Sequence, residues 1–190
     1  MTTDHDRHDL PTLWLHWLTA AAVLAAWGLG SAMDWAPRGP VRETLREAHV
    51  ACGLLVLAAA AARLVWRPLA RAPVRLPSPR WVRWAEKTVK TMLYVLPPAV
   101  ALLGIAMLWA KGRDVAPFGL VLLPTPWLRD RALGHALEDL HAMAADGLLL
   151  VVGLHAAASL LHGLVLRDGV LAGMLPARRR RPAASPGPGA

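Results

Sequence analysis

The chain has 190 residues, of which 55% are hydrophobic and only 18% charged, and its formal net charge is +8. This length suits a single domain, but the apolar excess is not that of a water-soluble globular protein. A basic chain could bind nucleic acid, yet the cations here flank long apolar runs. We therefore expect a membrane protein with no nucleic-acid partner. The single cysteine, Cys52, excludes an intrachain disulfide.

Long apolar runs recur along the chain. A bilayer core about 30 Å thick needs roughly 20 apolar residues per helix. Four runs meet this requirement: residues 12–33, 48–66, 92–110 and 141–166. The first is longer than a signal-peptide core and has no clear cleavage site after it, so we expect the mature chain to keep all four.

These runs predict an all-α fold, an integral membrane four-helix bundle formed by residues 11–176. A polar leader, residues 1–10, precedes the bundle. A basic, Pro/Gly-rich tail, residues 177–190, follows it and is expected to be disordered. The basic part of the tail suits contact with anionic lipid headgroups.

The cations are unevenly shared between the two sides of the predicted spans. One side holds thirteen and the other seven. Because cations favour the cytoplasmic side, we expect both termini in the cytoplasm. The richer side has Arg7, Arg67, Arg71, Arg75, Arg80, Arg83, Lys87, Lys90, Arg167, Arg178, Arg179, Arg180 and Arg181; the poorer side has Arg38, Arg42, Arg46, Lys111, Arg113, Arg129 and Arg131.

Four histidines lie in or beside the apolar runs. With the spans alternating in direction, His16 and His155 lie toward the cytoplasm, and His49 and His141 toward the periplasm. His141 and His155 are about 21 Å apart along a helix. In a bundle helix of about 3.5 residues per turn they share one face. The sequence therefore predicts two separate centres at two depths.

Haem held between two imidazoles is the occupant that this pattern favours. Histidine is a common axial haem ligand, and helix bundles often hold cofactors between facing side chains. We expect the pairs His16/His155 and His49/His141 to bind haem iron. Two protein ligands fill both axial positions, which favours electron transfer. A zinc site fits less well because zinc needs three or four converging ligands.

The depth match of one pair is imperfect. His16 lies only about five residues inside its run, whereas His155 is about eleven from the end of its own. The fourth helix must therefore tilt or project beyond the membrane for the two rings to meet. Single membrane histidines also serve helix packing, so a haem-free membrane anchor stays open as an alternative.

Several motifs resemble those of the bacterial cytochrome b561 family, which comprises di-haem, four-helix membrane proteins. The resemblance covers about residues 10–176. LHWLTA surrounds the first histidine and REAHVACGLLVLAAAAARLVWR the second. PFGLVLLP resembles the outer loop, and LHAMAADGLLLVVGLHAAASLLHGLVLRDGVLAGMLP the last helix with its RDGxLxxML ending.

The resemblance implies b-type haems on His16, His49, His141 and His155, and electron exchange with a quinone or a redox partner protein. Two features depart from the family. Many members have a proline where this chain has Ala101, and this chain instead carries Pro97 and Pro98. A glutamate commonly follows the third haem histidine, where this chain has Ala142.

Two further residues are candidates for the cofactor sites. Arg63 is charged within an apolar run and suits a haem propionate or a quinone, although it also fits snorkelling to the interface. His162 lies about 10.5 Å beyond His155 on the same face and suits a propionate or a quinone carbonyl; an interfacial position without a role is the alternative. Gly28, Gly53 and Gly104 fit close approach of either a porphyrin or another helix.

The sequence thus predicts an inner-membrane di-haem b-type cytochrome with two haem b groups. Its expected function is electron transfer between a periplasmic-side donor or acceptor and the quinone pool, in one version from superoxide to ubiquinone. An alternative is a haem-bearing membrane subunit of a dehydrogenase or hydrogenase. The expected partners are membrane lipids and quinone, with a redox protein as a further candidate.

Overall fold

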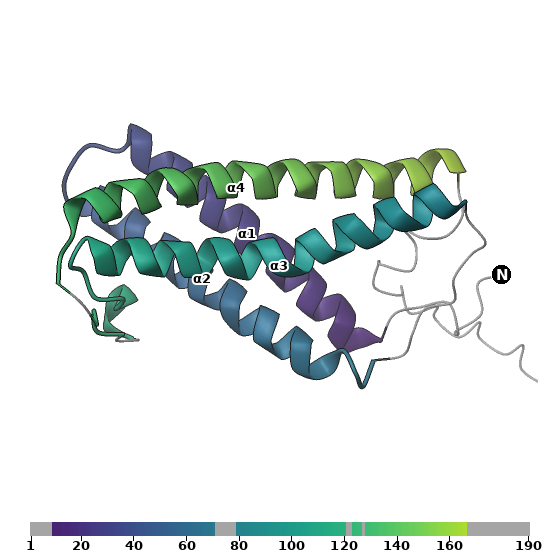
Figure 1. Ribbon diagram of the computed structural model, residues 1–190, viewed down its shortest axis with the longest axis horizontal. Coiled ribbons are helices and arrows are strands. Elements are labelled where there is room, and N and C mark those ends of the chain that lie inside the picture. Colours follow the sequence, from purple (N-terminus) through teal and green to yellow (C-terminus); the bar gives the residue numbers. More distant parts are fainter. Residues whose placement is uncertain (1–8, 71–78, 121–122, 127, 167–190) are drawn as a thin grey trace, which may run out of the picture.

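A computed structural model describes residues 9–70, 79–120, 123–126 and 128–166 (Figure 1). Its long helices are α1 (Leu10–Trp35), α2 (Pro40–Trp66), α3 (Arg80–Ala110) and α4 (Arg131–Leu160). A short π-helix, η3 (Leu161–Leu166), continues α4, and a 3-10 turn, η2 (Pro117–Gly119), lies between α3 and α4. All four long helices are long and apolar enough to cross a membrane. The prediction of an all-α, four-helix membrane bundle is confirmed.

Three helices begin well before the apolar runs from which they were predicted. α2 starts at Pro40, where the run starts at Ala48. α3 starts at Arg80 and α4 at Arg131, where the runs start at Met92 and His141. The additional turns are polar but have helical signals. Glu86 and Lys90 form an i,i+4 ion pair in α3, and the Asp130 side chain accepts a hydrogen bond from the Leu133 backbone N–H at the start of α4.

The bundle consists of two hairpins. α1 packs along α2 and α3 along α4, and α2 also contacts α3. The backbones of α1 and α4 rarely come close, so these two helices meet through side chains. In Figure 1 the start of α1, the end of α2, the start of α3 and the end of α4 lie at one end of the bundle, and the two hairpins diverge toward that end. The predicted leader and tail fall largely or wholly outside the described residues.

The buried core is small and lies between the hairpins. Ala22 and Val23 of α1, Val56 of α2 and Leu148 of α4 form its centre. Many large apolar side chains, such as Leu24, Leu102 and Leu150, are exposed in the isolated chain. This distribution suits helices whose outer faces contact lipid chains and not water.

Candidate functional site

The four histidines singled out in the sequence meet in two pairs, each joining the two hairpins. His16 of α1 faces His155 of α4, with ring centres 6.3 Å apart and ring planes at 69°. His49 of α2 faces His141 of α4, with ring centres 5.9 Å apart and planes at 76°. These are the two pairs that the depths of the residues in the sequence suggest. Within the described part of the chain, no three His, Cys, Asp or Glu side chains converge on one point.

Both ring separations fit a metal ion held between two imidazoles. A metal–nitrogen bond is about 2 Å long, and the nitrogen lies about 1 Å from its ring centre. Two imidazoles on opposite sides of one iron therefore have ring centres roughly 6 Å apart. The donor set is also suitable, because haem iron in electron-transfer proteins commonly takes imidazole on its axial positions.

The neighbouring helix of each hairpin orients the rings of His49 and His141. His49 Nδ1 lies 2.7 Å from the Ala26 carbonyl oxygen on α1, and His141 Nδ1 lies 3.0 Å from the Val100 carbonyl oxygen on α3. A carbonyl oxygen only accepts, so each Nδ1 carries the hydrogen and donates it. In the neutral ring Nε2 then keeps its lone pair for a metal, as is usual for metal-binding histidines.

A glycine lies under each of these two rings. Gly30 follows Ala26 by one helical turn, and a Cβ atom on it would lie 3.4 Å from His49 Cε1 and Nδ1. Gly104 follows Val100 by one turn, and its Cβ atom would lie 3.1 Å from His141 Cε1. Gly104 thus makes room for an imidazole, which is neither of the two roles suggested from the sequence. The sequence analysis did not single out Gly30. Gly30 can be recognised by its position four residues after Ala26, the residue whose carbonyl accepts the hydrogen bond from His49.

The second pair has a different environment. The His16 ring packs edge-on against Trp17, with centres 5.2 Å apart. The Leu15 carbonyl, next to His16, accepts hydrogen bonds from Thr19 Oγ1 at 2.7 Å and from Arg63 Nη2 at 2.8 Å. The depth mismatch expected for this pair does not prevent the contact. α4 continues unbroken past His155, and α1 is inclined to α4 (Figure 1).

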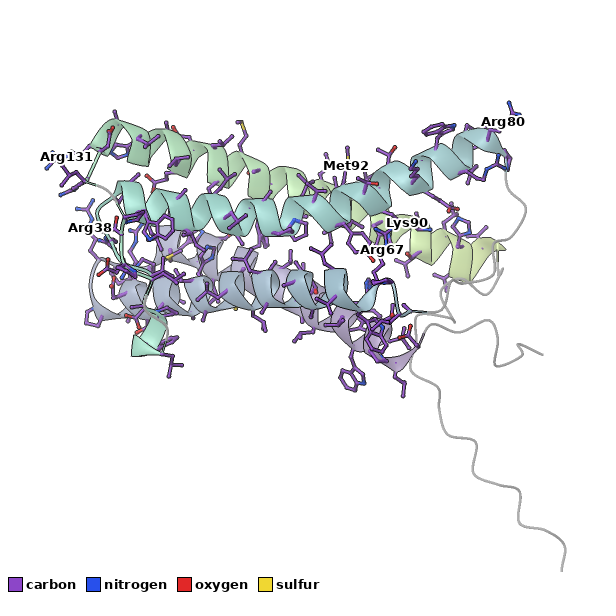
Figure 2. The ribbon with its side chains drawn as sticks, turned by 60° about the horizontal axis from the view of Figure 1, so that its bottom comes forward. Arg38, Arg67, Arg80, Lys90, Met92 and Arg131 are labelled. Atoms are coloured by element: carbon purple, nitrogen blue, oxygen red, sulfur yellow. The ribbon has the colours of Figure 1, made fainter. Side chains whose placement is uncertain are left out.

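The two additional candidates lie on the side of the bundle where the hairpins diverge. Arg63 reaches from α2 across to α1, so its guanidinium lies beside the backbone of the residue that precedes His16. His162 is half-buried and lies in the π-helix η3, beyond His155. A π-helical turn often marks a functional position in a helix. Figure 2 shows Arg67 and Lys90 on this side of the molecule, and Arg38 and Arg131 at the opposite end.

Some cations at that opposite end are already paired. Lys111 Nζ lies 2.7 Å from Glu138 Oε1, and Arg46 forms an ion pair with Glu43. Glu138 is also 3.5 Å from His135 Nδ1. This end also carries seven acidic side chains beside its seven cations, so its formal net charge is zero: Asp34, Glu43, Glu47, Asp114, Asp130, Glu138 and Asp139.

Comparison with known proteins agrees with this geometry. The family model described as prokaryotic cytochrome b561 matches residues 7–177. A probable superoxide oxidase, CybB, of Yersinia pestis is 30% identical over 177 residues, which cover 92% of this chain and 99% of that protein. Cytochrome b561 homolog 1 of Escherichia coli (strain K12) is 28% identical, with 92% and 99% covered, and homolog 2 of that strain is 25% identical, with 92% and 94% covered. The chain thus belongs to the prokaryotic cytochrome b561 family of membrane cytochromes.

Proposed function

We propose that this protein is a di-haem b-type cytochrome that passes electrons between the periplasmic side of the bacterial inner membrane and the quinone pool. Membership of the family implies b-type haem. The observation that carries the proposal is the meeting of four histidines in two pairs, with ring centres 5.9 and 6.3 Å apart. When bound, haem would supply one-electron chemistry, and the two histidine pairs are the residues that would hold it.

The chain's own residues hold and orient the cofactors. His49 and His141 would bind one iron and His16 and His155 the other, each through the ring nitrogen that faces the pair. The Ala26 and Val100 carbonyls fix the first two rings, which lowers the cost of ordering them on binding. Apolar side chains such as Val56 and Leu148 exclude water from the space between the hairpins.

The orientation that we propose follows the asymmetry of the cations. The end with Arg67, Arg80 and Lys90 faces the cytoplasm, and the end with Arg38 and Arg131 faces the periplasm. His49 and His141 are then the periplasmic pair. A quinone reaches the inner pair from the lipid, so the two centres form a path from one side of the membrane to the other.

One of the comparisons favours superoxide as the electron donor. The relative in Yersinia pestis is named a probable superoxide oxidase. At the proposed periplasmic end, cations such as Arg38, Arg42 and Arg129 would attract a small anion only locally and in a manner that depends on salt, because the acidic side chains of that end equal its cations in number. We therefore propose superoxide as the electron donor and a quinone as the acceptor.

Spectroscopy of the purified protein tests the proposal. We expect pyridine haemochrome analysis to give about two haem b per chain, and the reduced protein to show low-spin b-type bands. A reduced ubiquinone analogue should reduce the haems, and so should superoxide from a xanthine oxidase system. A well-folded but colourless preparation would instead support a haem-free membrane anchor and refute the proposal.

A further inference from the structure

Two residues of the four apolar runs are an aspartate, a glutamate, a lysine or an arginine: Arg63 and Asp146. The Arg63 guanidinium donates a hydrogen bond to the Leu15 carbonyl of the neighbouring helix. Asp146 of α4 has no hydrogen-bond or ion-pair partner among the residues that the structure describes. A carboxyl group in a membrane-spanning helix is costly when it lacks a partner, so Asp146 indicates a contact that the single chain does not make.

The packing of the core gives the depth of Asp146. Leu148 of α4 belongs to the same buried cluster as Ala22 and Val56, which lie near the middles of the apolar runs 12–33 and 48–66. Because a helix rises 1.5 Å per residue, Asp146 is only about 3 Å from Leu148 along the axis. Its carboxyl group therefore lies near the middle of the bilayer, too deep for this short side chain to reach the headgroups.

The side chain of Asp146 points away from the bundle. Residues two apart on a helix are rotated by about 200°, so Asp146 lies on the opposite side of α4 from the buried Leu148. The Asp146 side chain is accordingly exposed. α4 forms one edge of the bundle in both views (Figures 1 and 2). In the single chain this carboxyl group thus faces lipid chains.

The residues around Asp146 have the pattern of a surface where two helices pack. Met143, Leu150 and Ala157 follow one another at intervals of seven residues, and all three are exposed. Gly147 lies beside them, and nothing lies within 4 Å of a Cβ atom placed on it. A seven-residue repeat that includes small residues lets two membrane helices approach closely along their length. The outer face of α4 comprises Met143, Asp146, Gly147, Leu150, Gly153, Leu154 and Ala157.

We propose that the outer face of α4 binds the same face of a second copy of this chain, which forms a dimer in the membrane. Two copies inserted in the same orientation are related by a two-fold axis along the membrane normal, so their α4 helices are parallel. Each residue of the outer face then lies at the depth of its counterpart. The two Asp146 carboxyl groups meet near the middle of the bilayer, where they share a proton in a hydrogen bond and are removed from lipid.

A second copy is the occupant that these observations favour. Any other membrane protein would need a donor of its own at the depth of Asp146, whereas a second copy has its polar group at that depth by symmetry. The outer face also lies opposite the side of α4 that carries His141 and His155. The dimer therefore leaves both histidine pairs as they are, and it does not depend on the proposed function.

Disulfide cross-linking of the full-length protein in native membranes tests this interface. With the single cysteine removed (Cys52→Ser), a new cysteine is placed on the outer face by Leu150→Cys, or on α3 by Leu102→Cys. These two leucines are 65% and 57% exposed. We expect copper phenanthroline to convert most of Leu150→Cys, but little of Leu102→Cys, into a dimer of two 20.5 kDa chains. Monomer from both, equal yields from both, or a product that contains a different protein would overturn the proposal.

Two exposed glycines provide a matched pair of variants. Nothing lies within 4 Å of a Cβ atom on either Gly147 of the outer face or Gly28 of α1. Gly147→Leu should hold the two α4 helices apart and give monomer by native mass spectrometry, whereas Gly28→Leu should stay a dimer. Both variants should keep the haem content of the unaltered protein. A dimer in Gly147→Leu would refute the interface.

Asp146 variants give a second measurement that does not depend on added bulk. Asp146→Leu should weaken the dimer by about three- to thirty-fold in liposomes, measured by energy transfer between labelled copies, because a polar contact between membrane helices is lost. Asp146→Asn should recover most of the affinity, since an amide both donates and accepts. An unchanged affinity in Asp146→Leu would overturn the proposed contact. Haem content and reduction by quinol report on the proposed function separately.

Discussion

The Cε1 atom of His141 lies 3.1 Å from the position that a Cβ atom would take on Gly104. The ring also donates to the Val100 carbonyl one turn earlier on the same helix, so it cannot turn away without losing that hydrogen bond. The backbone of α3 therefore fixes both the position and the direction of the His141 imidazole. His49 has the same relationship to Ala26 and Gly30 of α1.

Gly104→Val should disrupt the outer histidine pair. The branched side chain would overlap the imidazole, and core positions tolerate such added volume poorly. We expect loss of about half of the haem and a stability decrease of about 1–3 kcal/mol. Haem content by pyridine haemochrome and thermal unfolding in detergent check this. Gly28→Val is the matched control, because nothing lies within 4 Å of a Cβ atom there; equal haem loss in both variants would contradict the explanation.

Single histidine substitutions should separate the two centres. His49→Ala or His141→Ala should remove mainly one haem, and His16→Ala or His155→Ala the other, because each pair is joined across the hairpins. Redox titration followed by absorbance should then show one component where the unaltered protein shows two. His135→Ala, at a side chain that is exposed and near Glu138, serves as the control and should keep both. If every ligand variant that folds lost both haems equally, the pairing would be wrong.

Asp130 should stabilise the start of α4 more than the nearby ion pair does. Its side chain accepts the Leu133 backbone N–H as an N-cap, and loss of such a cap costs about 0.5–2 kcal/mol. The pair of Lys111 and Glu138 is partly exposed, and such pairs contribute about 0–1 kcal/mol. Thermal unfolding of Asp130→Ala and Glu138→Gln in the same detergent compares the two. A larger loss in Glu138→Gln would reverse this ranking.

Asp9 should make stability depend on pH at the end where α1 begins. Trp66 Nε1 and Thr12 Oγ1 each donate to its carboxylate at 2.6 Å. Partial burial alone would raise the pKa of Asp9, but these side-chain hydrogen bonds outweigh it and the pKa is lowered. A lowered pKa in the folded state means that the stabilisation is complete above the unfolded value of about 3.9 and is lost as pH falls through the folded value.

Comparison of the unaltered protein with Asp9→Ala at several pH values measures this effect. We expect the variant to be less stable by about 1 kcal/mol at pH 7, since the group is near the surface, and the difference should shrink in acid. Asp34→Ala, at an exposed carboxylate near the other end of α1, should show a smaller effect at pH 7. A difference that stays constant down to the acid limit of folding would show that the Asp9 charge is not involved.

The sequence was sufficient to predict the four spans and which histidine rings lie close together, because apolar length and helical depth are local properties; that these rings bind haem iron stays a prediction. It was not sufficient to predict where α2, α3 and α4 begin. Residues 40–47, 80–91 and 131–140 are too polar to be recognised by apolar length, although they form regular helix. The partners of His49 and His141 were also missed, since a backbone carbonyl such as that of Ala26 leaves no mark in the side-chain sequence. The role of Gly30 could be recognised only once the structure showed that it lies against the His49 ring.

The scarcity of backbone contact between α1 and α4 has a consequence for biogenesis. Each hairpin has its own internal packing and can be completed in the bilayer as soon as its second helix leaves the ribosome. The two halves are joined by the packing of α2 against α3 and by the small core around Val56 and Leu148, and the proposed haems would add one histidine from each half to each iron. A shortage of cofactor in the cell should therefore leave chains that are inserted in the membrane but whose halves are held together less firmly.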